Sequence, residues 1–206
     1  MDATIADYLW WQDFRPDWAD AHCVTLLDAA TPEQVISDLG GHLIDRVTGI
    51  DALLAHAAAH AGESYNPTEA LIGVACTETG WTMIAEVNGY LGVTHELIRP
   101  LTVGRTVVAH FKNINAVYQF AWWRDGRLLT DLDLLFPAER AGDEPDAALH
   151  HLKAIGLTLD PDQDVSALNL SAAAFALAER ITGVACTPAL FERADFTVAV
   201  VPMSAG

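Results

Sequence analysis

The chain has 206 residues, 51% of them hydrophobic, which is enough to bury a sizeable core in one domain. It carries 28 acidic and 11 basic residues, for a net charge of −17 at pH 7. Nucleic-acid binding and attachment to anionic membranes both depend on Lys and Arg, so this balance argues against both. The charge favours a soluble protein and would attract a basic partner.

The N-terminal part predicts three helices and one strand. The helices are expected at residues 3–13, 32–39 and 49–61, and the strand at 22–27. The second helix has the clearest start, because Thr31 can cap it, Pro32 suits its first position and Gln34 completes a capping box. Pro16 is expected to end the first helix and Gly62 to close the third.

The middle of the chain is rich in predicted strands and in turn signals. Strands are expected at residues 70–76, 81–87, 106–111, 116–123 and 128–134. The pair Asp125-Gly126 stands between the last two and predicts a tight hairpin. Residues 63–137 carry 8 acidic and 5 basic residues, the least negative balance in the chain, and we expect this third to form the sheet.

The C-terminal part predicts helices at residues 145–156 and 171–182, a short helix from Thr187-Pro188 and a final strand at 196–201. Gly183 is expected to close the long helix. Consecutive strands with helices before and after them indicate an α+β fold. We expect a mostly antiparallel sheet of about five to seven strands packed against flanking helices, in a single domain over residues 1–206.

The three cysteines, Cys23, Cys76 and Cys186, each lie in an apolar run. They fit no zinc motif and cannot all pair with one another, so we expect buried, reduced thiols and a reducing compartment. The N-terminus shows no signal peptide, and no apolar run is long enough to span a bilayer. The sequence therefore predicts a cytoplasmic protein.

Three segments carry a resemblance to a known family. They are GVACTETGWTMIAEVNGYLG, FKNINAVYQFAWWRDGRL and ALAERITGVACTPAL. They resemble an uncharacterised family of actinobacterial domains of unknown function, over nearly the whole chain. The Gly80-Trp81 pair, Glu86, Asn88-Gly89 and the Thr182-Gly183 corner carry the match. The resemblance implies one intact domain and no particular activity.

Two histidines raise the question of a metal site. His56 and His60 stand four residues apart on a predicted helix and would share one face, with Glu63 as a third ligand. The glutamate of the common zinc-protease motif is missing between them. Histidines on a solvated helix face are common, so we expect no metal site and no cofactor, with these three residues as the alternative.

The predicted strands offer a second group of polar side chains. The less apolar strand faces can be placed to include Glu78, Glu86, His110, Tyr118, Asp131 and Asp133. If these faces coincide, the carboxylates, imidazole and phenol could support acid–base chemistry, whereas the alternative is a half-exposed sheet face. One of Trp122 and Trp123 must point away from the main core, where it could form an interface or pack under a helix. The binding residues expected on this surface are Trp81, Glu86, His110, Tyr118 and Trp123.

No nucleophile elbow, phosphate loop or dinucleotide fingerprint occurs in the sequence. Our first hypothesis is therefore an acidic binding module for a protein or peptide partner, with a basic partner as one form of it, in an accessory or immunity-like role. The alternative is a small-molecule enzyme or ligand-binding protein with a pocket between sheet and helices. A deep pocket lined by Glu86, His110 and Tyr118 would favour the alternative.

Overall fold

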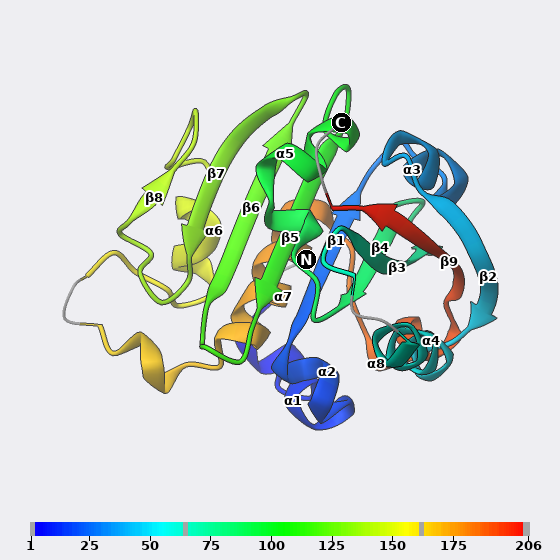
Figure 1. Ribbon diagram of the computed structural model, residues 1–206. Helices are drawn as coiled ribbons and strands as arrows, with labels where there is room; N and C mark the ends of the chain where they lie inside the picture. The colour runs from blue at the N-terminus through cyan, green and yellow to red at the C-terminus, as the bar shows by residue number, and fades with distance from the viewer. Residues whose placement is uncertain (1–2, 64–65, 161–162, 204–206) are drawn as a thin grey trace.

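A computed structural model describes residues 3–63, 66–160 and 163–203 of the chain (Figure 1). In this part the chain forms eight α-helices and one open sheet of nine strands, all paired antiparallel. The predicted α+β class and mostly antiparallel sheet are confirmed. No helix in the described ranges is long and apolar enough to cross a membrane.

The sheet has the strand order β2-β9-β3-β4-β1-β5-β6-β7-β8, so β2 and β8 are its edges (Figure 1). The strands are β1 (His22–Leu27), β2 (His42–Thr48), β3 (Glu69–Cys76), β4 (Thr82–Val87), β5 (Thr106–Lys112), β6 (Tyr118–Arg124), β7 (Arg127–Asp133), β8 (Arg140–Ala141) and β9 (Asp195–Pro202). The N-terminal β1 and the C-terminal β9 both lie inside the sheet, so segments from both ends of the chain complete it.

Helices cover both faces of the sheet, with α5 in front and α7 behind in the view of Figure 1. The α-helices are α1 (Trp11–Phe14), α2 (Pro16–Asp20), α3 (Pro32–Asp38), α4 (Ile50–Glu63), α5 (His95–Ile98), α6 (Leu149–Ala154), α7 (Leu170–Thr182) and α8 (Pro188–Arg193). Four 3-10 helices join them: η1 (Ile5–Tyr8), η2 (Leu91–Val93), η3 (Arg99–Leu101) and η4 (Val165–Ala167).

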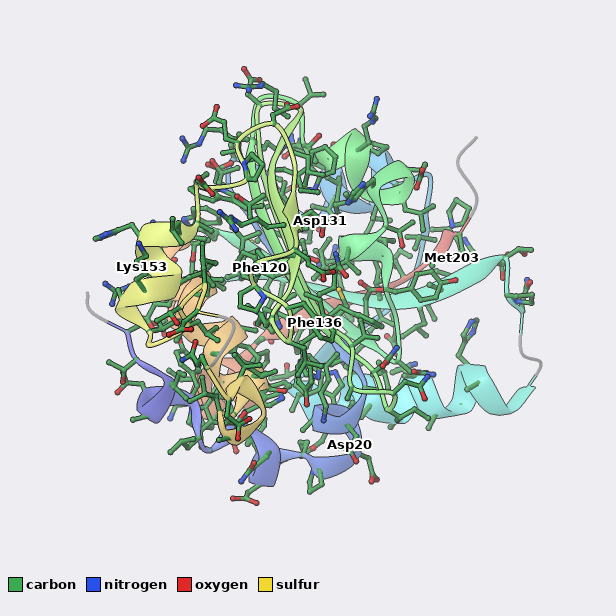
Figure 2. All side chains as sticks on the ribbon, turned by 90° about the vertical axis from the view of Figure 1, so that its left-hand side faces the viewer. Asp20, Phe120, Asp131, Phe136, Lys153 and Met203 are labelled. Atoms are coloured by element: carbon green, nitrogen blue, oxygen red, sulfur yellow. The ribbon has the colours of Figure 1, made fainter. Side chains whose placement is uncertain are left out.

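Each face of the sheet has its own hydrophobic core. The larger core lies on the side that we call the α7 face, where α1, α2, α4, α6, α7 and α8 pack around Phe175 and Phe120. The smaller core lies on the α5 face, under α3, α5, η2 and η3, and includes Trp123. Figure 2 views the molecule from the β8 side and places Phe120 and Asp131 on opposite sides of the sheet, with Lys153 of α6 beyond Phe120. Successive strand residues alternate between these two cores.

Several local signals in the sequence form the expected structures. Thr31 Oγ1 accepts a hydrogen bond from the Gln34 amide at 3.3 Å, and Gln34 Oε1 accepts one from the Thr31 amide at 2.9 Å. This is the predicted capping box of α3. Asp125 and Gly126 take φ angles of 50° and 77° and join β6 to β7 in the predicted hairpin. Gly183 has φ 74° and ends α7 as expected.

Other expectations are wrong. The predicted helix at residues 3–13 is instead η1 and α1, and Pro16 begins α2 rather than ending a helix. Strand β2 is missing from the prediction because almost every side chain in it is exposed, so no alternation marks it. The sheet also extends beyond residues 63–137, since β1, β2, β8 and β9 lie outside that third. With β2 and β8, the sheet has nine strands instead of five to seven.

Candidate functional site

The five residues expected to form a binding surface lie on two different faces of the sheet. Glu86 pairs with Cys23 of β1, whereas His110 pairs with the next residue, Val24. Neighbouring residues in a strand point in opposite directions, so Glu86 lies on the α5 face and His110 on the α7 face. The expected convergence of a carboxylate and an imidazole therefore does not occur.

The remaining three residues divide between the same two faces. Tyr118 and Trp81 are partly buried and pack against the core of the α7 face. Trp123 belongs to the core of the α5 face, is 3% exposed, and meets the ring of His95 edge-on at 5.5 Å. Of the two roles expected for this tryptophan, an exposed interface or packing under a helix, the second fits Trp123.

Glu86 holds a turn in place. Its carboxylate is 1% exposed and accepts hydrogen bonds from the amides of Leu91 at 3.0 Å and Gly92 at 3.3 Å. Burial raises the pKa of this carboxyl group, and the Leu91 amide partly offsets the rise. A Cβ added at Gly89 would lie 2.2 Å from Glu86 Oε2, so only glycine fits there. These contacts give Glu86 a structural role, because its carboxylate fixes the start of η2.

His110 lies deep in the core of the α7 face beside His22. The two rings are 5.6 Å apart, and His110 meets Phe175 at 4.3 Å. Burial lowers the pKa of His110 well below its usual value and lowers that of His22 to about 3. Both rings are therefore neutral at pH 7 and buried away from solvent.

The other polar strand residues have separate roles. Asp131 lies on the α5 face, where its Oδ2 is 2.9 Å from His95 Nε2. Asp133 Oδ1 accepts hydrogen bonds from the amides of Tyr118 and Leu135 and so orders the end of β7. Glu78 lies in the turn after β3 and lines the larger cleft described below.

Of the three candidate metal ligands, the structure describes the side chains of His56 and His60. His56 Nε2 lies 3.1 Å from Asp45 Oδ2 of β2, and His60 follows one turn later on α4. The side chain of Glu63 lies outside the described residues. Within the described ranges, no group of three His, Cys, Asp or Glu side chains could hold a metal ion.

The cysteines do not all behave as expected. Cys23 and Cys186 are buried free thiols, as predicted, but Cys76 is exposed. The prediction for Cys76 is wrong because it is the last residue of β3, where the strand leaves the buried part of the sheet. Its thiol lines a cleft there.

This cleft is the larger of two neighbouring cavities and has a volume of about 710 Å³. It lies at the end of the sheet, where β3 stops and β9 begins. Its walls come from the start of α3, from β2, from the turn after β3, from the segment 183–187, and from α8. The lining residues are Pro32, Glu33, Arg46, Cys76, Thr77, Glu78, Thr79, Gly183, Val184, Ala185, Thr187, Ala189, Leu190, Arg193, Ala194, Asp195 and Thr197.

Three charged side chains of the larger cleft are held by hydrogen bonds. Arg46 of β2 donates to Glu33 of α3 at 2.8 Å across the cleft wall. Asp195 accepts a hydrogen bond from the Thr48 hydroxyl at 2.7 Å. Ala189 and Leu190 of α8 add small and apolar side chains to the lining. The cleft therefore offers both charge signs and an apolar surface to a ligand.

The second cavity, of about 350 Å³, lies beside the first, and both are lined by Ala185 and Thr187. Its other lining residues are Ala3, Asp7, Tyr8, Trp10, Glu179 and Cys186. The Tyr8 hydroxyl donates to Glu179 Oε2 at 2.6 Å. Burial and the hydrogen bond to Glu179 raise the pKa of Tyr8, and burial with the nearby Glu179 raises that of Cys186 to about 12.

Neither cavity is lined by Trp81, Glu86, His110, Tyr118 or Trp123. Of the residues that do line them, the polar group predicted from the strands includes only Glu78. The others were missed because the contacts join distant parts of the chain. Tyr8 and Glu179, for example, are 171 positions apart. The segment around Thr182-Gly183 was noted for its resemblance to the family, and it is the one signal that leads to both cavities.

Comparison with known proteins tests the resemblance to a family of unknown function. No curated protein and no solved structure matches the chain. One family model, described as a family of unknown function, DUF6461, matches residues 1–206. The expected membership of a family of unknown function is thereby confirmed: the chain belongs to the family DUF6461.

Proposed function

We propose that this protein is a binding module for an extended segment of a protein or peptide partner, held in the larger cleft. The observation that carries the proposal is the cleft of about 710 Å³ at the end of the sheet. Its volume lies within the range of about 300–1,000 Å³ that is typical of ligand sites. Its walls combine backbone, both charge signs and apolar side chains, which suits the mixed chemistry of a polypeptide.

The edge strand β2 supports a polypeptide as the ligand. β2 is one of the two edge strands of the sheet and contributes Arg46 to the cleft wall. Leu43 and Ile44 of the same strand are 51% and 46% exposed. An extended segment can bind by pairing with such an edge while its side chains enter neighbouring pockets.

The net charge of −17 supports a basic partner, because the field of the protein would speed association with it. An accessory or immunity-like role, in which the module shields a basic protein, is part of the proposal. So is a reducing compartment such as the cytoplasm, which suits three free cysteines.

The alternative of a small-molecule enzyme has less support. Catalytic cysteines need a lowered pKa, whereas burial raises the pKa of Cys186 to about 12. The acid–base pair expected from the sequence, Glu86 and His110, is divided by the sheet.

The proposal can be tested by selecting ligands from a displayed library of random peptides. The affinity of a selected peptide is then measured by fluorescence anisotropy. Ala189→Trp fills the cleft from α8 and should weaken binding by about tenfold or more, equivalent to about 1.4 kcal/mol. Ala58→Trp places the same side chain on the exposed face of α4 and should leave the affinity unchanged. Failure to select any peptide, or equal affinities for both variants, would overturn the proposal.

A further inference from the structure

The smaller cavity has a feature that the larger cleft lacks: a nearly buried carboxylate on its wall. Glu179 is 8% exposed and lines the cavity. Tyr8 donates to its Oε2 at 2.6 Å, while Oε1 accepts no hydrogen bond from any described residue. Oε1 is not fully enclosed, so a donor or a positive charge that enters the cavity can reach it. A cationic group in the cavity would supply that charge.

Among the described residues, the two charged side chains that line the cavity are both acidic. Asp7 lines it together with Glu179 and has an exposed carboxylate, which accepts hydrogen bonds from the amide and hydroxyl of Thr4 at 2.9 and 2.8 Å. Arg180 follows Glu179 in α7 but does not line the cavity, and its Nη1 donates to the carbonyl of Ala3 at 3.0 Å. An anion would be repelled here and a cation attracted.

Aromatic rings complete the wall. Tyr8 and Trp10 both line the cavity, with their ring centroids 6.3 Å apart. Aromatic faces attract ammonium and guanidinium groups, and they also pack against the aliphatic part of a basic side chain. Ala3 and Ala185 add small apolar surfaces. Carboxylates together with aromatic rings form a wall suited to an alkylammonium or alkylguanidinium ion.

The position of the cavity relates it to the larger cleft. Ala185 and Thr187 line both, so a polypeptide in the larger cleft could extend one side chain over the segment 183–187 into the smaller cavity. We propose that the smaller cavity binds the charged end of a lysine or arginine side chain belonging to the segment held in the larger cleft. The source of the cation rests on the proposed function, whereas the preference of the cavity for a cation does not.

The cation preference is tested first with n-butylammonium and its neutral analogue n-butanol. Binding is followed by NMR at the backbone amides of Ala185, Cys186 and Thr187. Butylammonium should shift these signals with a dissociation constant on the order of millimolar, as expected for so small a ligand, and butanol should not. Equal responses to the two compounds, or no response to either, would overturn the inference.

Two variants assign the effect to the carboxylates. Glu179→Gln keeps an acceptor for the Tyr8 hydroxyl and should weaken butylammonium binding about tenfold, and Asp7→Asn should weaken it by a smaller factor. Glu96→Gln removes an exposed carboxylate from α5 on the other face and serves as the matched control. If Glu179→Gln and Asp7→Asn, folded like the parent by their NMR spectra, bind as tightly as Glu96→Gln, the inference is wrong.

The source of the cation is tested with the peptides selected for the larger cleft. Selected peptides should contain lysine or arginine, and replacing that residue with norleucine should weaken binding to the parent protein but not to Glu179→Gln. A peptide that needs the cleft but is insensitive to this replacement would leave the proposed function standing and overturn the inference. If butylammonium binds while no peptide does, the cavity takes a free amine and the proposed function fails by itself.

Discussion

The buried His22 should make the protein sensitive to mild acid. It is 1% exposed, and its ring meets those of Trp11 at 4.8 Å and Phe175 at 6.2 Å. Burial and the nearby Lys112 lower its pKa from 6.5 to about 3. In the unfolded chain the same imidazole takes up a proton below about pH 6.5, whereas in the folded protein it stays neutral. Acid therefore stabilises the unfolded state relative to the folded one.

The size of the effect follows from proton linkage. Between the two pKa values, the free energy of unfolding falls by about 1.36 kcal/mol for each pH unit. From pH 7.5 to pH 4.5 the contribution of His22 is about 2.7 kcal/mol, because most of the uptake occurs below pH 6.5. His22→Leu replaces the imidazole with an apolar side chain of similar size and removes this contribution.

The assay is urea unfolding at pH 7.5 and pH 4.5 for the parent protein, for His22→Leu and for His150→Leu. His150 is exposed, so its replacement controls for the loss of a histidine. The loss of stability between the two pH values should be about 2.7 kcal/mol smaller in His22→Leu than in the parent, and unchanged in His150→Leu. A loss in His22→Leu equal to that of the parent would refute the reasoning.

Three further outcomes are expected. Tyr8→Phe should lower the free energy of unfolding, measured with urea, by about 1–3 kcal/mol, because the nearly buried carboxylate of Glu179 loses its donor. Tyr90→Phe at an exposed site serves as the control and should change this free energy little. Trp123→Ala should cost about 3–5 kcal/mol in the same assay, and a smaller cost would contradict its burial in the core. Thiol titration of the native protein should label Cys76 alone, with the other two cysteines reacting only after denaturation.

Much of the fold could be predicted from sequence because its signals are local. A capping box or an Asp-Gly turn acts over a few residues, as α3 and the β6–β7 hairpin show. Strand β2 could not be recognised, because it pairs with β9 from the other end of the chain and buries almost no side chain. Its pairing is a long-range contact that no periodicity records.

The candidate site was harder to predict than the fold. The assignment of strand residues to a wet or a dry face depended on the register between strands, which a single residue of shift reverses. Glu86 and His110 were expected together and lie on opposite faces for this reason. The burial of Glu86 could not be recognised from the sequence, because its hydrogen-bond partners are backbone amides of the turn that follows. Both cavities form only where distant segments meet.

The turn that follows β4 affects how the family can be recognised. Glu86, Asn88 and Gly89 stand in a segment from which the sequence analysis inferred the resemblance, and each has an architectural reason. Glu86 accepts hydrogen bonds from two amides, Asn88 takes a φ angle of 52°, and Gly89 has no room for a Cβ. A sequence search that weighs this segment heavily would retrieve chains that make the same turn, whatever they bind. Subfamilies that differ in ligand would be better separated by the residues at positions 7, 179, 185–187 and 189, which line the two cavities.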